Sequence, residues 1–177
     1  MVSRQQKIVA VVAIIVVVII VSAGGLSLLM NQPPKPSMAE KMILKQGDIG
    51  SFGFQSSSVG QWPMDRANES SIFRATLSNE TIHLYLRIDV FNSSNDSRIA
   101  FKDVLQSLTY SSENITLGDE AVYWQQNPRL PSMVFIRSNV MAWVQTQSYG
   151  VDYVWLRNAT IALATLQLDR IDSYLTG

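Results

Sequence analysis

The pattern of apolar and polar positions divides the chain in two. One long apolar run near the amino terminus is followed by a larger part in which apolar residues recur at short, regular intervals. Residues 8–30 form a 23-residue stretch without a charged side chain. At about 1.5 Å of rise per helical residue, a helix of this length crosses a hydrocarbon core of roughly 30 Å. In the rest of the chain, apolar residues alternate with polar ones or recur every three or four positions, which indicates strands and helices. The pattern therefore predicts a membrane-spanning helix that tethers a folded domain.

The domain shows both strand and helix periods. Alternation is clearest at 81–91, where aliphatic residues occupy every second position. The predicted strands cover residues 52–55, 71–77, 81–91, 121–125, 133–137 and 140–148, and short polar turns at 78–80 and 138–139 join two of the pairs. The predicted helices cover residues 38–44, 97–110 and 153–175, with Ser37 and Asp152 as N-caps. Residues 111–118 and most of 47–60 are expected to be loops.

The order of these elements, β–β–β–α–β–β–β–α, predicts an α+β fold. We expect a mainly antiparallel sheet packed by two helices that share one of its faces. The predicted organisation is a cytoplasmic leader at 1–7, a transmembrane signal-anchor at 8–30, a proline-rich spacer at 31–37 and an extracytoplasmic α+β domain at 38–177. Three prolines in four positions make the spacer stiff and extended.

The leader favours an amino terminus on the cytoplasmic side. It carries Arg4 and Lys7 and no acidic residue. Cleavage is the alternative to an anchor, because Val21-Ser22-Ala23 resembles a signal-peptidase site. Apolar residues continue beyond that site to Met30, so we expect the anchor to stay uncleaved.

Asparagine sequons point to export. Six of the nine asparagines begin Asn-x-Ser/Thr triplets, where about one or two would be expected by chance. These are Asn68, Asn79, Asn92, Asn95, Asn114 and Asn158. All but Asn158 fall in predicted loops or turns. The pattern predicts a glycosylated, exported domain; the alternative is a surface rich in Ser and Thr with unused acceptors.

The amino-acid composition excludes several kinds of functional site. There is no cysteine, which excludes disulfides and thiolate sites, and no basic cluster of the kind that binds nucleic acid. The one histidine, His83, lies on the polar side of a predicted strand. Asp119 and Glu120 are neighbours, and neighbouring strand residues point to opposite faces, so we interpret them as boundary residues of a strand. No metal, cofactor or catalytic site is predicted, and we do not expect an enzyme.

The last predicted helix carries two apolar stripes. One contains Trp155 with Ala159, Ala162, Leu163 and Leu166, and is assigned to the core. The other is a row spaced by seven: Val154, Ile161, Leu168 and Leu175. Such a row indicates either a helix buried on two sides or a face for a partner or a second copy. For Trp62 and Trp124, burial and an exposed contact role both remain open.

Short motifs in the second half of the domain resemble the PsbP-like extracytoplasmic domains of envelope-anchored proteins, which include sensor modules outside membrane kinases. The matching segments are Leu117-Gly118-Asp119-Glu120-Ala121, 135–140, Trp143-Val144 and 164–171. The resemblance implies a non-catalytic domain that binds partners or small ligands. This chain differs from many such domains in having no cysteine and no lipidated amino terminus.

These features together favour a single-pass membrane protein whose domain is a binding or accessory module for an envelope protein or a small ligand. The alternative is a pilin-like subunit of a surface filament or layer, assembled through its first helix. Residues 4–7 lack the small residue expected before a prepilin cleavage site, which disfavours that alternative.

Overall fold

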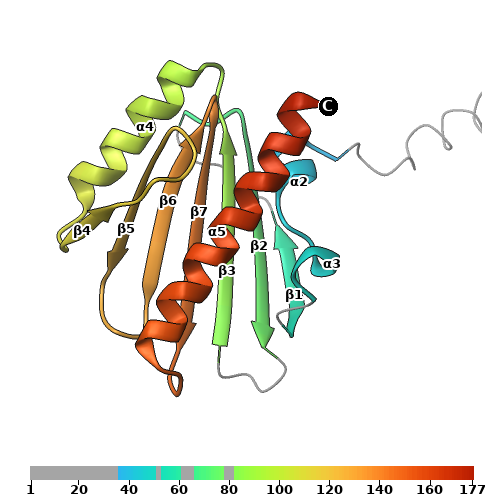
Figure 1. The fold of residues 1–177 in the computed structure, drawn as a ribbon. Coiled ribbons are helices and arrows are strands. Elements are labelled where there is room, and N and C mark those ends of the chain that lie inside the picture. Colours follow the sequence, from blue (N-terminus) through green and yellow to red (C-terminus); the bar gives the residue numbers. More distant parts are fainter. Residues whose placement is uncertain (1–35, 51–52, 61–65, 78–81) are drawn as a thin grey trace, which may run out of the picture. The chain divides into compact units, whose positions relative to one another are not determined.

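One antiparallel sheet organises the domain (Figure 1). The structure is a computed structural model that describes residues 36–50, 53–60, 66–77 and 82–177. Seven strands lie in the order β1-β2-β3-β7-β6-β5-β4, and every neighbouring pair is antiparallel. They are β1 (Phe54–Gly60), β2 (Glu69–Leu77), β3 (Ile82–Val90), β4 (Ser112–Asn114), β5 (Glu120–Gln125), β6 (Pro131–Arg137) and β7 (Val140–Ser148). The helices are α2 (Met38–Met42), α3 (Gln46–Ile49), α4 (Ser94–Ser107) and α5 (Tyr153–Thr176). The predicted α+β class is confirmed.

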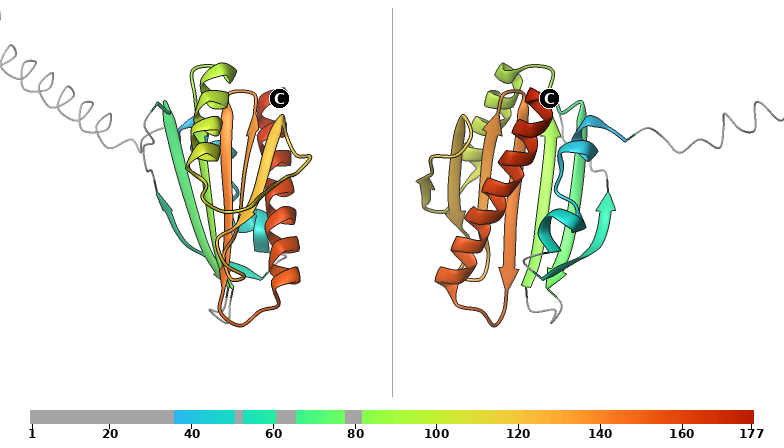
Figure 2. Two further views of the ribbon diagram at one scale, coloured as in Figure 1. Left: turned by 90° about the vertical axis from the view of Figure 1, so that its left-hand side faces the viewer. Right: turned by 45° about the vertical axis from the view of Figure 1, so that its right-hand side comes forward.

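The two long helices lie on opposite faces of the sheet (Figure 2). Strand β6 shows this directly, because Met133 and Phe135 pack in the cluster that contains α5. Their neighbours Val134 and Ile136 pack in the cluster that contains α4. The prediction that both helices share one face is therefore wrong. Successive apolar residues along β6 need cover on both sides, which a helix on one face alone cannot give.

Helix α4 covers only part of its face. Its buried residues Phe101 and Val104 contact apolar side chains of β5, β6 and β7. No helix of the described residues packs against the same face of β2 and β3, where Arg74 and His83 are exposed. Alternation in β3 explains the difference, since its aliphatic residues all point toward α5 and its polar ones point away.

The segment before β1 is held against α5 by a buried glutamine. The side chain of Gln167 accepts a hydrogen bond from the backbone N–H of Leu44 (3.1 Å) and donates one to the carbonyl oxygen of Met42 (2.8 Å). At the other end of α2, the amide of Ala39 donates to Glu69 at the start of β2 (3.1 Å). Ser37 caps α2 as predicted, accepting from the Glu40 amide.

Most predicted elements are confirmed, and the differences lie in polar segments. Residues 47–60 contain α3 and the seven-residue strand β1 in place of a loop with a short strand. Residues 111–118 contain the three-residue strand β4, and α4 begins three residues earlier than predicted, capped by Ser93. Both strands are at sheet edges and are rich in polar residues, so an apolar pattern does not reveal them.

The buried stripe of α5 differs from the predicted one. It consists of Leu156, Thr160, Leu163, Ala164, Gln167 and Ile171. Trp155 is 46% exposed, so its assignment to the core is wrong. Two buried polar residues, Thr160 and Gln167, lie in the stripe; their partners on β7 and in the α2 segment are not apparent from the sequence.

The predicted transmembrane segment, residues 8–30, lies outside the described residues. Among the helices that the structure does describe, none combines the length and apolar character needed to cross a membrane.

Candidate ligand-binding face

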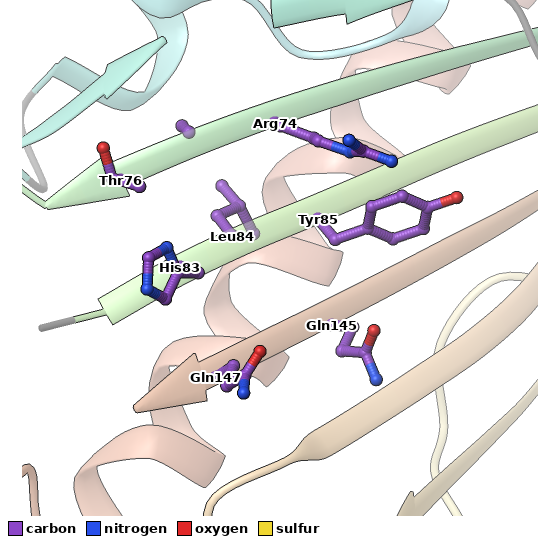
Figure 3. A pocket seen from close by; sticks show the side chains of 8 residues that line it. Arg74, Thr76, His83, Leu84, Tyr85, Gln145 and Gln147 are labelled. Carbon is purple, nitrogen blue, oxygen red and sulfur yellow. The ribbon is translucent and has the colours of Figure 1, made fainter. Parts of the chain in front are cut away.

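The sheet surface that α4 leaves uncovered carries hydrogen-bonding side chains from three adjacent strands. We call it the open face; it consists of Arg74 and Thr76 on β2, His83 and Tyr85 on β3, and Gln145 and Gln147 on β7. The register places Arg74, Tyr85 and Gln145 side by side in one row. Thr76, His83 and Gln147 form the next row. The two rows line a shallow cavity of about 300 Å³ (Figure 3).

Figure 3 shows Arg74, Tyr85, His83, Gln145 and Gln147 pointing away from α5, which lies behind the sheet. This orientation follows from the pleat, since alternate residues of β3 and β7 fill the core on the α5 side. The exposed polar groups are therefore held on rigid strands, which suits a binding surface better than mobile loops do.

A second depression of about 400 Å³ continues from the open face. We call it the loop groove; it is lined by Asn127, Pro128, Arg129, Leu130, Gln147 and Tyr149. Gln147 belongs to both surfaces and donates to the hydroxyl oxygen of Tyr149 (2.6 Å). The loop between β5 and β6 is fixed beside β7, because the amide of Ser148 donates to the carbonyl oxygen of Arg129 (3.1 Å).

Two arginines on this surface differ from the others. Arg74 lies over the ring of Tyr85 and Arg129 over the ring of Tyr149, each with its guanidinium carbon 5.8 Å from the ring centre. Six other arginines of the described residues lie 2.6–3.7 Å from a carboxylate: Arg66, Arg87, Arg98, Arg137, Arg157 and Arg170. Within the same residues, Arg74 and Arg129 have no carboxylate partner. Both arginines are exposed, and each contacts the face of a tyrosine ring.

A buried ion pair lies at the opposite end of β3. Asp89 accepts from the Ser70 hydroxyl (2.5 Å) and from Arg87 (2.8 Å). Burial raises the pKa of Asp89 above its ordinary value, against the lowering effects of Ser70 and Arg87. Its carboxylate is enclosed, so Asp89 does not offer a binding group to a ligand.

Tyr123 on β5 is the second perturbed group, and it belongs to the α5 face. Burial raises its pKa to about 12, and Arg157 lies over its ring at 5.1 Å. Arg157 in turn pairs with Glu113 on β4 (2.9 Å). This arrangement closes the edge of the core beneath the first turns of α5.

His83 is exposed, as the sequence predicted. Asp119 and Glu120 also lie at a loop–strand boundary as predicted, and they share no site: Asp119 pairs with Arg137 (3.2 Å), and Glu120 with Arg98 (3.7 Å). Among the described residues, no cluster of three His, Cys, Asp or Glu side chains could hold a metal ion.

The five sequon asparagines that the structure describes are all exposed, and none belongs to the open face. Asn79 lies outside the described residues. Asn68 and Asn92 precede β2 and follow β3 as predicted, and their side-chain amides are hydrogen-bonded (2.5 Å). Two placements are corrected: Asn95 lies in the first turn of α4 and Asn114 in β4. The polar stretches around both residues form regular elements because they pair with, or pack on, the apolar strands beside them.

The tryptophans and the α5 row considered as possible contact residues lie partly in the core and partly on the surface. Trp124 is buried and meets Trp143 edge-on, with ring centres 5.0 Å apart; Trp62 lies outside the described residues. In the row spaced by seven, Val154 and Leu175 are exposed, whereas Ile161 and Leu168 pack against the core. The row is therefore not one continuous exposed stripe, and its role as a partner-binding face stays a prediction.

Sequence reasoning did not identify the open face. Its residues come from segments about seventy positions apart, and only the strand register brings Arg74 beside Gln145. The available signal was the polar character of alternate positions in β3 and β7, which indicated an exposed surface without indicating that three strands contribute to it.

No family model matches the chain, and no curated protein matches its sequence. Among solved structures, it is similar to the extracellular domain of PknH from Mycobacterium tuberculosis, with a TM-score of 0.55 and 9% sequence identity. The match covers 80% of this chain and 98% of that domain. At this identity the likeness shows the α+β fold alone, and the resemblance to PsbP-like domains stays a prediction.

Proposed function

We propose that the chain is a membrane-tethered, extracytoplasmic binding module without catalytic activity. The apolar run at 8–30 supports the tether, and the sequons support export. The fold is also that of a domain described as extracellular, the PknH domain, which is compatible with this location. The module would bind an envelope partner or a ligand while anchored by its amino-terminal helix.

The observation that carries the binding role is the open face. Among the described residues, no helix covers this face of β2 and β3, and the side chains that line it are mostly polar. Arg74 on this face and Arg129 in the adjoining loop groove each lie over a tyrosine ring and have no carboxylate partner among the described residues. His83 and Gln147 lie in the row next to Arg74, and Gln147 also lines the loop groove. Solvent-facing donors gathered on one surface in this way are suited to recognition.

Site-specific photo-crosslinking tests the proposal. A photoreactive amino acid is placed at Gln145 of the full chain in native membranes, and at Lys102 on the exposed side of α4 as a control. We expect adducts from position 145, formed on the outer side of the membrane, that are absent from position 102. Equal labelling at both positions, or none at 145, would contradict a binding role for the open face.

A further inference from the structure

We propose that the ligand of the open face and the loop groove is an acidic oligosaccharide that carries carboxylates on more than one sugar unit. This inference rests on the binding role proposed above and specifies its chemistry. Three features of the surface support it: its charge, the spacing of its two arginines and the character of its other side chains.

The charged side chains of the open face and the loop groove favour an anionic ligand. Arg74, Arg129 and His83 are its ionisable bases, and no Asp or Glu is among the residues that line either depression. The chain as a whole has as many acidic as basic residues, so this separation is local. Guanidinium groups that lack an internal carboxylate partner are suited to bidentate binding of a ligand carboxylate.

The spacing of the arginines favours an extended ligand. Tyr85 pairs with Gln145, which precedes Tyr149 by four residues along the same strand direction. Tyr149 directly follows the last residue of β7. At about 3.4 Å per strand residue, the backbone positions of Gln145 and Tyr149 lie up to roughly 14 Å apart, so the two arginine–tyrosine pairs occupy separate places along the surface. A ligand that engages both pairs at once is best matched by one with acidic groups repeated along its length.

The other side chains that line the surface favour a sugar over a peptide. His83, Gln145 and Gln147 present donors and acceptors that match hydroxyl groups, and the cavity floor is shallow. Peptides are usually recognised through pairing at a strand edge or by apolar anchors in deep pockets. The open face is the middle of a sheet, and it offers neither feature.

The described sequons leave this surface free. Asn68, Asn92, Asn95, Asn114 and Asn158 all lie outside both depressions, so glycans on them would not be attached to the binding residues. A site for an exogenous saccharide is therefore compatible with a glycosylated domain.

Binding of oligogalacturonate to the whole chain in detergent micelles tests the inference. Methyl-esterified oligogalacturonate is the control that keeps the sugar and removes the charge. Poly-glutamate is the control that keeps the repeated carboxylates on a peptide. We expect oligogalacturonate to bind and the ester to bind at least tenfold more weakly. Arg74→Gln and Arg129→Gln should each weaken binding about fivefold or more, and the double variant should weaken it further. The control Arg98→Gln removes the same charge from α4 and should stay within twofold of the parent.

Added salt should weaken binding less in the double variant than in the parent, because fewer charges meet the ligand. Arg74→Lys, which keeps the charge but loses the planar fork, should fall between the parent and Arg74→Gln. The inference is overturned if oligogalacturonate does not bind, if the ester binds equally well, or if poly-glutamate binds more tightly with the same dependence on both arginines. Crosslinks from position 145 that persist alongside any of these results would leave the binding role intact and reject only the saccharide.

Discussion

Gly118 holds the loop before β5 against the hairpin between β6 and β7. Its φ is +61°, and a Cβ atom there would lie 2.5 Å from the carbonyl oxygen of Ile136. That oxygen accepts from the Asp119 amide (2.8 Å), and the Asp119 carboxylate accepts from the Ser138 amide (2.7 Å). The glycine in the Leu-Gly-Asp-Glu-Ala segment therefore has a defined structural purpose.

Gly118→Ala should lower the free energy of unfolding by about 2–4 kcal/mol, because the side chain meets backbone that cannot move aside. Gly150→Ala is the control, since nothing lies within 4 Å of its Cβ position and its φ is not in the left-handed region. Urea unfolding followed by tryptophan fluorescence measures both. Equal losses for the two variants would show that the close approach to Ile136 does not matter.

Asp89 gives the domain a specific pH dependence. Because its pKa is raised in the folded state from the ordinary value of 3.8, the folded protein keeps this proton to higher pH than the unfolded chain. Its contribution to stability is therefore fully present below about pH 4 and is lost as the pH rises through the folded-state pKa. Asp89→Asn does not titrate, so the stability of the parent relative to this variant should fall between pH 3.5 and pH 7.

Urea unfolding of both proteins at the two pH values measures this difference. Asp103→Asn is the control, because Asp103 forms an exposed pair with Arg66. A relative stability that increases with pH would mean that the attraction of Arg87 and Ser70 for the carboxylate outweighs its burial.

At the scale of elements, Gln167 links the segment that follows α2 to the last helix. Gln167→Leu leaves the buried amide of Leu44 and the carbonyl of Met42 without partners, so we expect a loss of about 2–4 kcal/mol in the free energy of unfolding. Hydrogen exchange at the Leu44 amide should accelerate as well. Gln126→Leu, at an exposed glutamine, should change stability by less than about 0.5 kcal/mol. A stable Gln167→Leu variant with a protected Leu44 amide would contradict this role.

The row spaced by seven on α5 combines two environments, and substitution separates them. Ile161→Asp should destabilise the domain by about 2–3 kcal/mol, because Ile161 packs against the core. Val154→Asp should have little effect on stability, since Val154 is 56% exposed. Thermal unfolding and sedimentation measure stability and association. If Ile161→Asp stays fully stable and alters only association, the row is a docking face after all.

The elements differ in how far the sequence predicts them. Strand β3 is predictable because its aliphatic side chains face the core and its polar ones face solvent. Strands β1 and β4 are not, because an edge strand pairs on one side only and tolerates runs such as Gln55-Ser56-Ser57-Ser58 and Ser112-Glu113-Asn114. The buried stripe of α5 differs from the predicted one because it includes the polar residues Thr160 and Gln167. Their side chains are hydrogen-bonded in the core, and a pattern of apolar residues does not reveal such positions.

At the scale of the whole molecule, α+β class follows from the element order, but the side on which each helix packs does not. The apolar residues at every position from Met133 to Ile136 show that β6 is covered on both faces. No local sequence pattern predicts that α4 leaves its face of β2 and β3 uncovered. The open face therefore depends on the strand register and on where α4 packs on the sheet, and neither can be read from a local sequence pattern.

In the proposed function, the domain lies outside the cytoplasm and its open face is accessible to solvent. Because the chain has no cysteine, single-cysteine variants report on this without background. In intact cells, a membrane-impermeant maleimide should label Gln145→Cys rapidly. Thr146→Cys, whose side chain is buried on the opposite face, should not react, and Ser3→Cys in the leader should react only after permeabilisation. Labelling of Ser3→Cys in intact cells while Gln145→Cys stays unmodified would contradict the account.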